Sequence, residues 1–235
     1  MDETYRETYV PVRSRMKGMR RVTDESTDAH LKRSRAVWNR RSDSYARDER
    51  ELAAQRETAI DHLDPAVGDR VLEIGCGPGT NFERIGSEIG ATGSLLAVDY
   101  SPEMADRARD RVAAGGWDNG DVRVADATTV AFESAFDVSL AILSMSVMPD
   151  KRRAVENVYD ALHDGGRLVV FDVRPVPSGP GRIFNPILRR ALQWYANWNP
   201  TGDVETAIAD VFDESEVVET YFGGVGYTVL AHKYK

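Results

Sequence analysis

Short apolar runs alternate with amphipathic segments through the middle of the chain. Five of these runs are rich in β-branched residues and are bounded by polar or turn-forming residues, as buried strands are. They cover residues 70–74, 94–98, 122–125, 136–143 and 167–172. The segments between them repeat apolar residues at helical spacing. Strands that alternate with helices predict an α/β fold, a doubly wound domain built on a mostly parallel sheet.

Residues that typically cap helices mark the starts of three of them. Thr80 and Glu83 have the spacing of a capping box, and Ser101 stands before Pro102 as an N-cap before a first-turn proline. Asp150 can cap the third helix. These signals predict a helix start at each of the three positions.

The C-terminal part has a different pattern. After a loop rich in proline and glycine, apolar and aromatic residues share one face of a predicted helix that extends from Phe184 to Trp198. Residues 216–221 and 225–233 are predicted to form two strands of a terminal hairpin. Together with the five earlier strands, this hairpin predicts a seven-stranded sheet.

Charge is distributed unevenly along the chain. Residues 1–41 contain eleven Lys/Arg and six Asp/Glu, so they carry +5, which leaves −13 for the remainder of a chain whose net charge is −8. An acidic body repels phosphates, which argues against a nucleic-acid partner. The basic arm has two interpretations, a solvated tail or a contact with RNA or an anionic membrane.

No segment predicts export or insertion into a membrane. No run approaches the roughly 18 uninterrupted apolar residues of a spanning helix, and the first residues lack the apolar core of a signal peptide. Cys76 is the single cysteine, so no internal disulfide can form. We therefore expect a cytoplasmic protein.

A glycine-rich loop follows the first predicted strand and precedes a helix. Gly75, Gly77 and Gly79 alternate with single residues, and such a loop lets the backbone approach a ligand at a helix N-terminus. Thr80 occupies the position of the third glycine in a dinucleotide-binding loop, which disfavours a nicotinamide-dependent dehydrogenase. A purely structural turn is the alternative.

The loop sequence Glu-Ile-Gly-Cys-Gly-Pro-Gly-Thr, at residues 73–80, resembles the E/D-x-G-x-G-x-G motif of class I methyltransferases, and similar motifs continue to about residue 173. That family has a Rossmann-like seven-stranded sheet with an antiparallel last strand. The resemblance implies a methyltransferase that uses S-adenosylmethionine as its cofactor. It also implies a cofactor cradle formed by Glu73, Gly75, Cys76, Gly77 and Gly79.

The ends of the second and third predicted strands supply further candidates for binding the cofactor. The two oxygens of the Asp99 carboxylate match the two cis hydroxyls of a ribose, and the resemblance implies this role. Tyr100 and Met104 are candidate adenine contacts, with Met104 as an ordinary core residue the alternative. Asp126, followed by Ala127, is expected at the adenine amino group, with a simple strand-end cap as the alternative.

Candidates on the acceptor side come from two segments. In the resembling family the end of the fourth strand faces the transferred methyl group, which implies Leu143 at the cofactor and Ser144 and Met145 at the acceptor. Asp137 begins that strand and is interpreted as structural. Trp194 and Tyr195 belong to the aromatic helix, which either covers the acceptor as a lid, touches a membrane peripherally, or packs on the sheet.

The residues before the domain favour one branch of the family. Residues 38–45 resemble the helix that precedes the domain in ubiquinone/menaquinone biosynthesis-type methyltransferases, where a tyrosine, here Tyr45, closes over the cofactor. This implies a small, apolar, quinone-like or lipid-like acceptor. The Asp/Asn/Ser-Pro-Pro-aromatic signature of base-methylating enzymes is absent, and the fuller quinone-enzyme signatures are not met. A non-catalytic S-adenosylmethionine-binding regulator remains an alternative.

These assignments divide the chain into segments, although the sequence leaves several properties open. They are a basic arm at 1–30 and a methyltransferase domain at 31–235, itself divided into a helical cap at 31–66, a cofactor-binding core at 67–173, a lid-like insertion at 174–215 and the hairpin at 216–235. The four histidines lack metal-ligand spacing, so no metal is expected. The methylated atom, a general base and the oligomeric state are not predicted.

Overall fold

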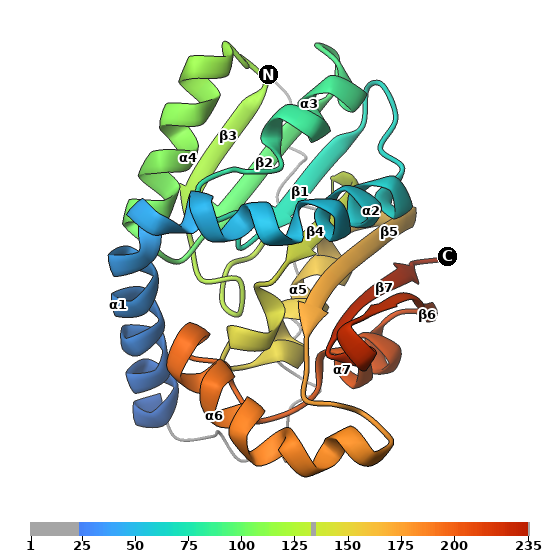
Figure 1. The fold of residues 1–235 in the computed structure, drawn as a ribbon. Coiled ribbons are helices and arrows are strands. Elements are labelled where there is room, and N and C mark those ends of the chain that lie inside the picture. The colour runs from blue at the N-terminus through green and yellow to red at the C-terminus, as the bar shows by residue number, and fades with distance from the viewer. Residues whose placement is uncertain (1–23, 133–134, 235) are drawn as a thin grey trace.

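The computed structural model describes residues 24–132 and 135–234, which form a seven-stranded sheet in the order β3-β2-β1-β4-β5-β7-β6 (Figure 1). Strands β1 to β5 are parallel, and β7 runs antiparallel to both of its neighbours. The predicted fold is therefore confirmed. The strands are β1 (Arg70–Ile74), β2 (Ser94–Asp99), β3 (Gly120–Val124), β4 (Phe136–Ile142), β5 (Leu162–Val173), β6 (Glu214–Tyr221) and β7 (Gly226–His232).

Helices cover both faces of the sheet and bury one apolar cluster on each. On one face lie α2 (Ala53–Leu63), α3 (Phe82–Ile89) and α4 (Pro102–Gly115), and on the other lie α5 (Lys151–Ala161) and α7 (Val204–Val211). Each helix turns its apolar stripe toward the sheet because that removes the stripe from water.

Two of the three predicted helix caps are confirmed. The Ser101 side chain accepts a hydrogen bond from the Met104 N–H at the start of α4, and that of Asp150 accepts one from the Arg153 N–H at the start of α5. The capping box at Thr80 is wrong, because α3 begins at Phe82 and its N-cap is Asn81. The Asn81 side chain makes no capping bond, since it is engaged elsewhere in the site described below.

The C-terminal insertion differs in detail from its prediction. It contains η3 (Pro180–Phe184) and α6 (Asn185–Ala196), and α6 ends before Trp198 because Asn197 adopts a left-handed conformation, with φ of 54°. The chain then turns inward and buries Trp198. Helix α7 was not predicted; Asp203 caps it and its apolar face belongs to the core.

The N-terminal helix begins earlier than predicted. Helix α1 (Asp24–Asp48) includes residues assigned above to the arm, and η1 (Glu49–Leu52) joins it to α2. Figure 1 shows α1 beside the end of the sheet, next to α6. Within 24–132 and 135–234, no helix has the length and apolar character needed to cross a membrane.

Candidate functional site

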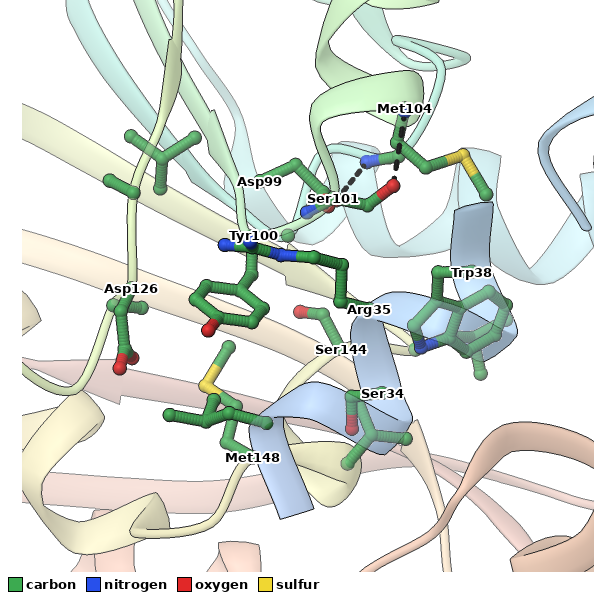
Figure 2. Close-up of a pocket in the computed structure, with 18 of the residues that line it drawn as sticks. Ser34, Arg35, Trp38, Asp99, Tyr100, Ser101, Met104, Asp126, Ser144 and Met148 are labelled. Atoms are coloured by element: carbon green, nitrogen blue, oxygen red, sulfur yellow. Dashed lines mark hydrogen bonds between the residues drawn. The ribbon is translucent and has the colours of Figure 1, made fainter. Parts of the chain in front are cut away.

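A cavity lies at the carboxyl edge of the sheet, between strand ends and helix α1 (Figure 2). The strand order reverses between β1 and β4, and ligands of open α/β sheets bind at such a switch point. The space at this edge, with its open mouth included, is about 770 Å³.

The glycine loop forms the floor of this cavity through Gly75 and Gly77. The N–H groups of Gly75 and Cys76 both donate to the Val98 carbonyl oxygen, at 2.8 and 3.0 Å, which fixes the loop to β2. Gly75 has φ of 67°, and a Cβ there would lie 2.3 Å from Cβ of Ser144. Only glycine allows the ends of β1 and β4 to approach this closely. Cys76 and Gly79 belong to the same turn but do not line the cavity.

Asp99 lines the cavity at the end of β2 and also holds the loop. Its Oδ2 accepts a hydrogen bond from the Gly77 N–H at 2.9 Å, and its Oδ1 accepts one from the Ser101 N–H at 2.8 Å. Burial raises the pKa of Asp99 to about 6, because desolvation outweighs the N–H groups that favour the carboxylate. A second lone pair on each oxygen remains for a ligand.

Glu73 lies behind the loop and does not line the cavity. Its buried carboxylate accepts a 2.6 Å hydrogen bond from the Asn81 amide, whose oxygen accepts one from Arg56 on α2 at 3.2 Å. The acid of the motif therefore ties β1 to the first residues of α3 and to α2. This geometry fits a residue that positions the loop.

The predicted adenine contacts come from the segments that follow β2 and β3. Tyr100, Met104, Asp126 and Ala127 all line the cavity. Asp126 also stabilises its own turn, since its Oδ1 accepts hydrogen bonds from the Thr128 N–H and hydroxyl at 2.9 and 2.7 Å. The two interpretations of Asp126 are therefore compatible: it caps a strand end and faces the cavity.

The end of β4 contributes further residues to the lining of the cavity. Leu143 and Ser144 line it, whereas Met145 is buried in the core on the other face of the sheet, so it does not face the cavity as predicted. Leu143 has a positive φ of 53°, a conformation that branched side chains rarely adopt outside constrained sites. The Ser144 hydroxyl donates to the Ile74 carbonyl oxygen at 2.8 Å.

The segment after β4 completes this wall and is anchored from behind. It includes η2 (Met145–Val147) and presents Val147, Met148 and Pro149 to the cavity. The buried Asp172, at the end of β5, accepts a 2.8 Å hydrogen bond from the Ser146 N–H. Burial raises the pKa of Asp172, although the bonds to Ser146 and Val173 and the charge of Lys151 oppose this shift.

Helix α1 supplies a wall through residues that the sequence analysis did not assign to the site. Leu31, Ser34, Arg35 and Trp38 face the cavity from consecutive turns of this helix (Figure 2). The Arg35 guanidinium carbon lies 4.4 Å from the centroid of the Tyr100 ring, a cation–π contact across the cavity. Tyr45 also belongs to α1, but its side chain is outside the described residues, so its predicted role is not tested.

Polar contacts hold α1 against neighbouring segments. The Asn197 amide donates to the Ser34 hydroxyl at 2.7 Å, and Nε2 of His30 lies 2.7 Å from the Val147 carbonyl oxygen. Burial lowers the pKa of His30, which favours the neutral ring. Helix α1 is thus joined to the end of α6 and to the segment after β4.

The aromatic residues predicted on the acceptor side lie elsewhere. Trp194 and Tyr195 do not line the cavity. Trp194 points into solvent. Tyr195 lies beneath the Arg41 guanidinium, whose carbon is 3.9 Å from the centroid of the Tyr195 ring. Trp194 does not pack on the sheet either, since no residue of α6 is buried.

The chemistry available in the cavity is limited. Among the residues that the structure describes, no histidine, lysine or cysteine lines it, and no group of three or more His, Cys, Asp or Glu side chains is placed to hold a metal ion. Its ionisable side chains are Arg35, Asp99, Tyr100 and Asp126. The cavity is therefore equipped to bind and orient ligands more than to transfer protons.

Known proteins resemble this chain in both sequence and fold. A family model described as a methyltransferase domain matches residues 71–166. Aklanonic acid methyltransferase DauC of Streptomyces sp. (strain C5) is 30% identical over 178 residues, which cover 73% of this chain and 80% of that protein. Phosphatidylethanolamine N-methyltransferase of Cereibacter sphaeroides is 30% identical over 167 residues, which cover 70% of this chain and 78% of that protein.

A solved structure shows the same fold at lower sequence identity. Geranyl diphosphate C-methyltransferase from Streptomyces coelicolor A3(2), in complex with Mg²⁺, geranyl diphosphate and S-adenosyl-L-homocysteine, superposes with a TM-score of 0.63 at 19% identity. The alignment covers 80% of each chain. At this identity the similarity concerns the fold alone.

Proposed function

Since the chain belongs to the class I S-adenosylmethionine-dependent methyltransferases, we propose that it methylates a small, apolar, quinone-like or lipid-like acceptor. The observation that supports this acceptor class is the wall between the end of β4 and α1. Leu31, Leu143, Val147, Met148 and Pro149 line it, and none of these side chains is ionisable. Ser34, Arg35 and Ser144 of these elements also line the cavity, but apolar side chains predominate, and such a lining favours a mostly apolar ligand.

The cavity fits the cofactor, whose sulfonium supplies an electrophilic methyl group when it is bound. In the proposed arrangement Asp99 accepts hydrogen bonds from the ribose hydroxyls, because its carboxylate faces the cavity at the end of β2. Tyr100, Met104 and Asp126 hold the adenine, and Gly75 and Gly77 leave space for the methionine part.

The residues of the chain would accelerate methyl transfer chiefly by orientation. Alignment of two bound reactants can provide a large part of a rate enhancement, and the described lining offers no histidine or lysine as a base. Leu143, held in its strained conformation by the 2.7 Å bond from its N–H to the Phe171 carbonyl oxygen, would set the position of the acceptor.

The names of the relatives support a small-molecule acceptor. The names of the two sequence relatives given above refer to aklanonic acid and to phosphatidylethanolamine, and neither refers to a nucleic acid or a protein. The acidic charge of the chain agrees with this choice, since it disfavours nucleic acid.

The test combines a binding measurement with transfer of a labelled methyl group. Calorimetry should show that S-adenosylmethionine and its demethylated product bind, and that Asp99→Ala weakens both by about 1.5–3 kcal/mol, the cost of a lost charge-assisted hydrogen bond. The protein is then incubated with methyl-labelled cofactor and either a total lipid extract or total RNA. Label in an organic-soluble product supports the proposal, whereas label in RNA contradicts the apolar acceptor.

A further inference from the structure

Large apolar side chains form an exposed surface on η3 and α6. Ile183, Phe184, Ile187 and Trp194 are 77%, 65%, 72% and 79% exposed. Ile187 and Trp194 are seven residues apart on one helix, so they lie along the same stripe. Monomeric proteins rarely expose a contiguous group of such residues unless it binds something. We call these four side chains the α6 surface.

The α6 surface faces away from the cavity. The neighbouring Tyr195 packs beneath Arg41 of α1, and Asn197 holds Ser34, so the inner side of α6 is fixed against α1. Figure 1 shows α6 at the extremity of the molecule, beyond the end of β5. The surface is therefore presented on a helix that is fixed against α1, the helix whose other residues line the cavity.

The charge around the α6 surface is opposite to that of the whole chain. Residues 174–202 contain four arginines and no acidic residue, in a chain of net charge −8. Arg182 precedes Ile183, and Arg190 lies between Ile187 and Trp194. Both arginines are exposed, and neither forms an ion pair with a described residue. Positive charge that flanks an apolar stripe is typical of helices that lie in a membrane interface.

We propose that the α6 surface docks the protein on an anionic lipid bilayer. Ile183, Ile187 and Trp194 enter the headgroup region, where tryptophan is favoured, while Arg182 and Arg190 contact lipid phosphates. The acidic part of the chain, outside residues 1–41 and 174–202, is repelled by the same bilayer, which favours an orientation with the α6 surface toward it. A second copy of the chain is disfavoured as the occupant, because a symmetric contact would bring the two basic surfaces together.

The experiment uses the full chain and vesicles of phosphatidylcholine, with or without phosphatidylglycerol. Flotation should show binding only to the anionic vesicles, and added salt should weaken it. Ile187→Ser combined with Trp194→Ser should weaken binding at least tenfold. Arg182→Gln combined with Arg190→Gln should do the same, since each arginine near an anionic surface is worth about fivefold.

Matched controls distinguish the α6 surface from general stickiness. Val67→Ser removes an equally exposed apolar side chain from the loop between α2 and β1, and Arg123→Gln removes an exposed arginine on β3; both should bind like the parent.

Tryptophan emission should shift to the blue with vesicles, and Trp194→Phe should lose that shift. Undiminished binding by both double variants would overturn the proposal and would indicate that the basic N-terminal residues make the contact with the vesicles. Dissociation of a dimer by those variants, without vesicle binding by the parent, would overturn it in favour of self-association.

Discussion

At the scale of single residues, Asp99 links the protonation state of the site to its geometry. Its carboxylate holds the N–H groups of Gly77 and Ser101 and faces the cavity. A protonated carboxyl is a poorer acceptor for these N–H groups and for ribose hydroxyls. Because the pKa of Asp99 is raised from 3.8 to about 6, both interactions weaken within an accessible pH range.

We therefore expect the affinity for S-adenosylmethionine to fall as the pH is lowered through about 6. With that pKa, the dissociation constant should rise about tenfold between pH 7 and pH 5. The stability of the ligand-free protein depends on pH in the opposite direction. The folded chain holds the Asp99 proton more tightly than the unfolded chain, so the stability contributed by Asp99 decreases as the pH rises from about 4 to about 6. Calorimetry across this range is the measurement, and Asp99→Asn should bind weakly with a flat profile. An unchanged slope in Asp99→Asn would assign the titration to another group.

Two glycines allow the cost of a left-handed backbone to be measured separately from the cost of a steric clash. Gly75 and Gly116 have similar φ angles, 67° and 65°, but a Cβ on Gly75 would meet Ser144 at 2.3 Å, whereas nothing lies within 4 Å of one on Gly116. Gly116→Ala should cost about 1–2 kcal/mol of stability through its left-handed backbone alone, with cofactor binding intact. Gly75→Ala should cost more and also abolish binding, as measured by denaturation and calorimetry. Equal effects of the two substitutions would show that the approach of β1 to β4 is unimportant.

The residues that the sequence could identify are those whose role follows from local position. Asp99 was found because it ends a strand beside the glycine loop, and it lines the cavity. Glu73 was found by the same motif, but its side chain points behind the loop toward Asn81, which no local pattern specifies. Ser34 and Arg35 were missed, because two polar residues on a helix indicate a solvated face until the cavity next to them is known.

At the scale of elements, local patterns predicted every strand of the sheet, with shifts only at the ends. The connections were harder to predict. Trp194 and Trp198 are four residues apart and both fit one helical face, yet one is exposed and the other is buried. The left-handed Asn197 between them ends the helix, and asparagine gives only a weak signal for such an end. Tertiary contacts of Asn197 and of Asn199, whose N–H donates to the Ser146 carbonyl oxygen, select this turn.

Helix α1 contributes one wall of the cavity, and Asn197 is one of its anchors. Asn197→Gly removes the amide that donates to Ser34 but keeps a residue that tolerates φ of 54°. We expect α1 to open more often, so that the cofactor dissociates at least fivefold faster while the melting temperature changes little. Stopped-flow release of the cofactor and hydrogen exchange of α1 are the measurements. Gly202→Asn serves as the control for this stretch of chain. Gly202 also has a positive φ, and nothing lies within 4 Å of a Cβ placed on it. Dissociation at the rate of the parent would show that α1 is not the barrier to release.

At the scale of the whole molecule, the cavity joins elements that are far apart in the sequence. Its walls come from α1 and from the ends of β1, β2, β3 and β4, whereas β6 and β7 contribute no described residue to it. Binding of the cofactor should therefore restrain one part of the fold directly and the remaining part only through global stability. This difference separates a ligand in the proposed site from one bound elsewhere on the protein.

S-adenosylmethionine at about one hundred times its dissociation constant should stabilise the folded chain by roughly 2.7 kcal/mol. For a chain of this size that corresponds to a rise in melting temperature of about 5–10 °C. Hydrogen exchange through local opening should slow in α1, in the loop around Gly75–Gly79 and after β4, because these segments contact the ligand, while local opening at β6 should be unaffected. Nicotinamide dinucleotide is the matched ligand control, since the loop lacks the dinucleotide spacing, and it should leave the melting temperature unchanged. Protection centred on β6 and β7, or an equal shift with the dinucleotide, would place the ligand outside the cavity and contradict the assignment of Asp99.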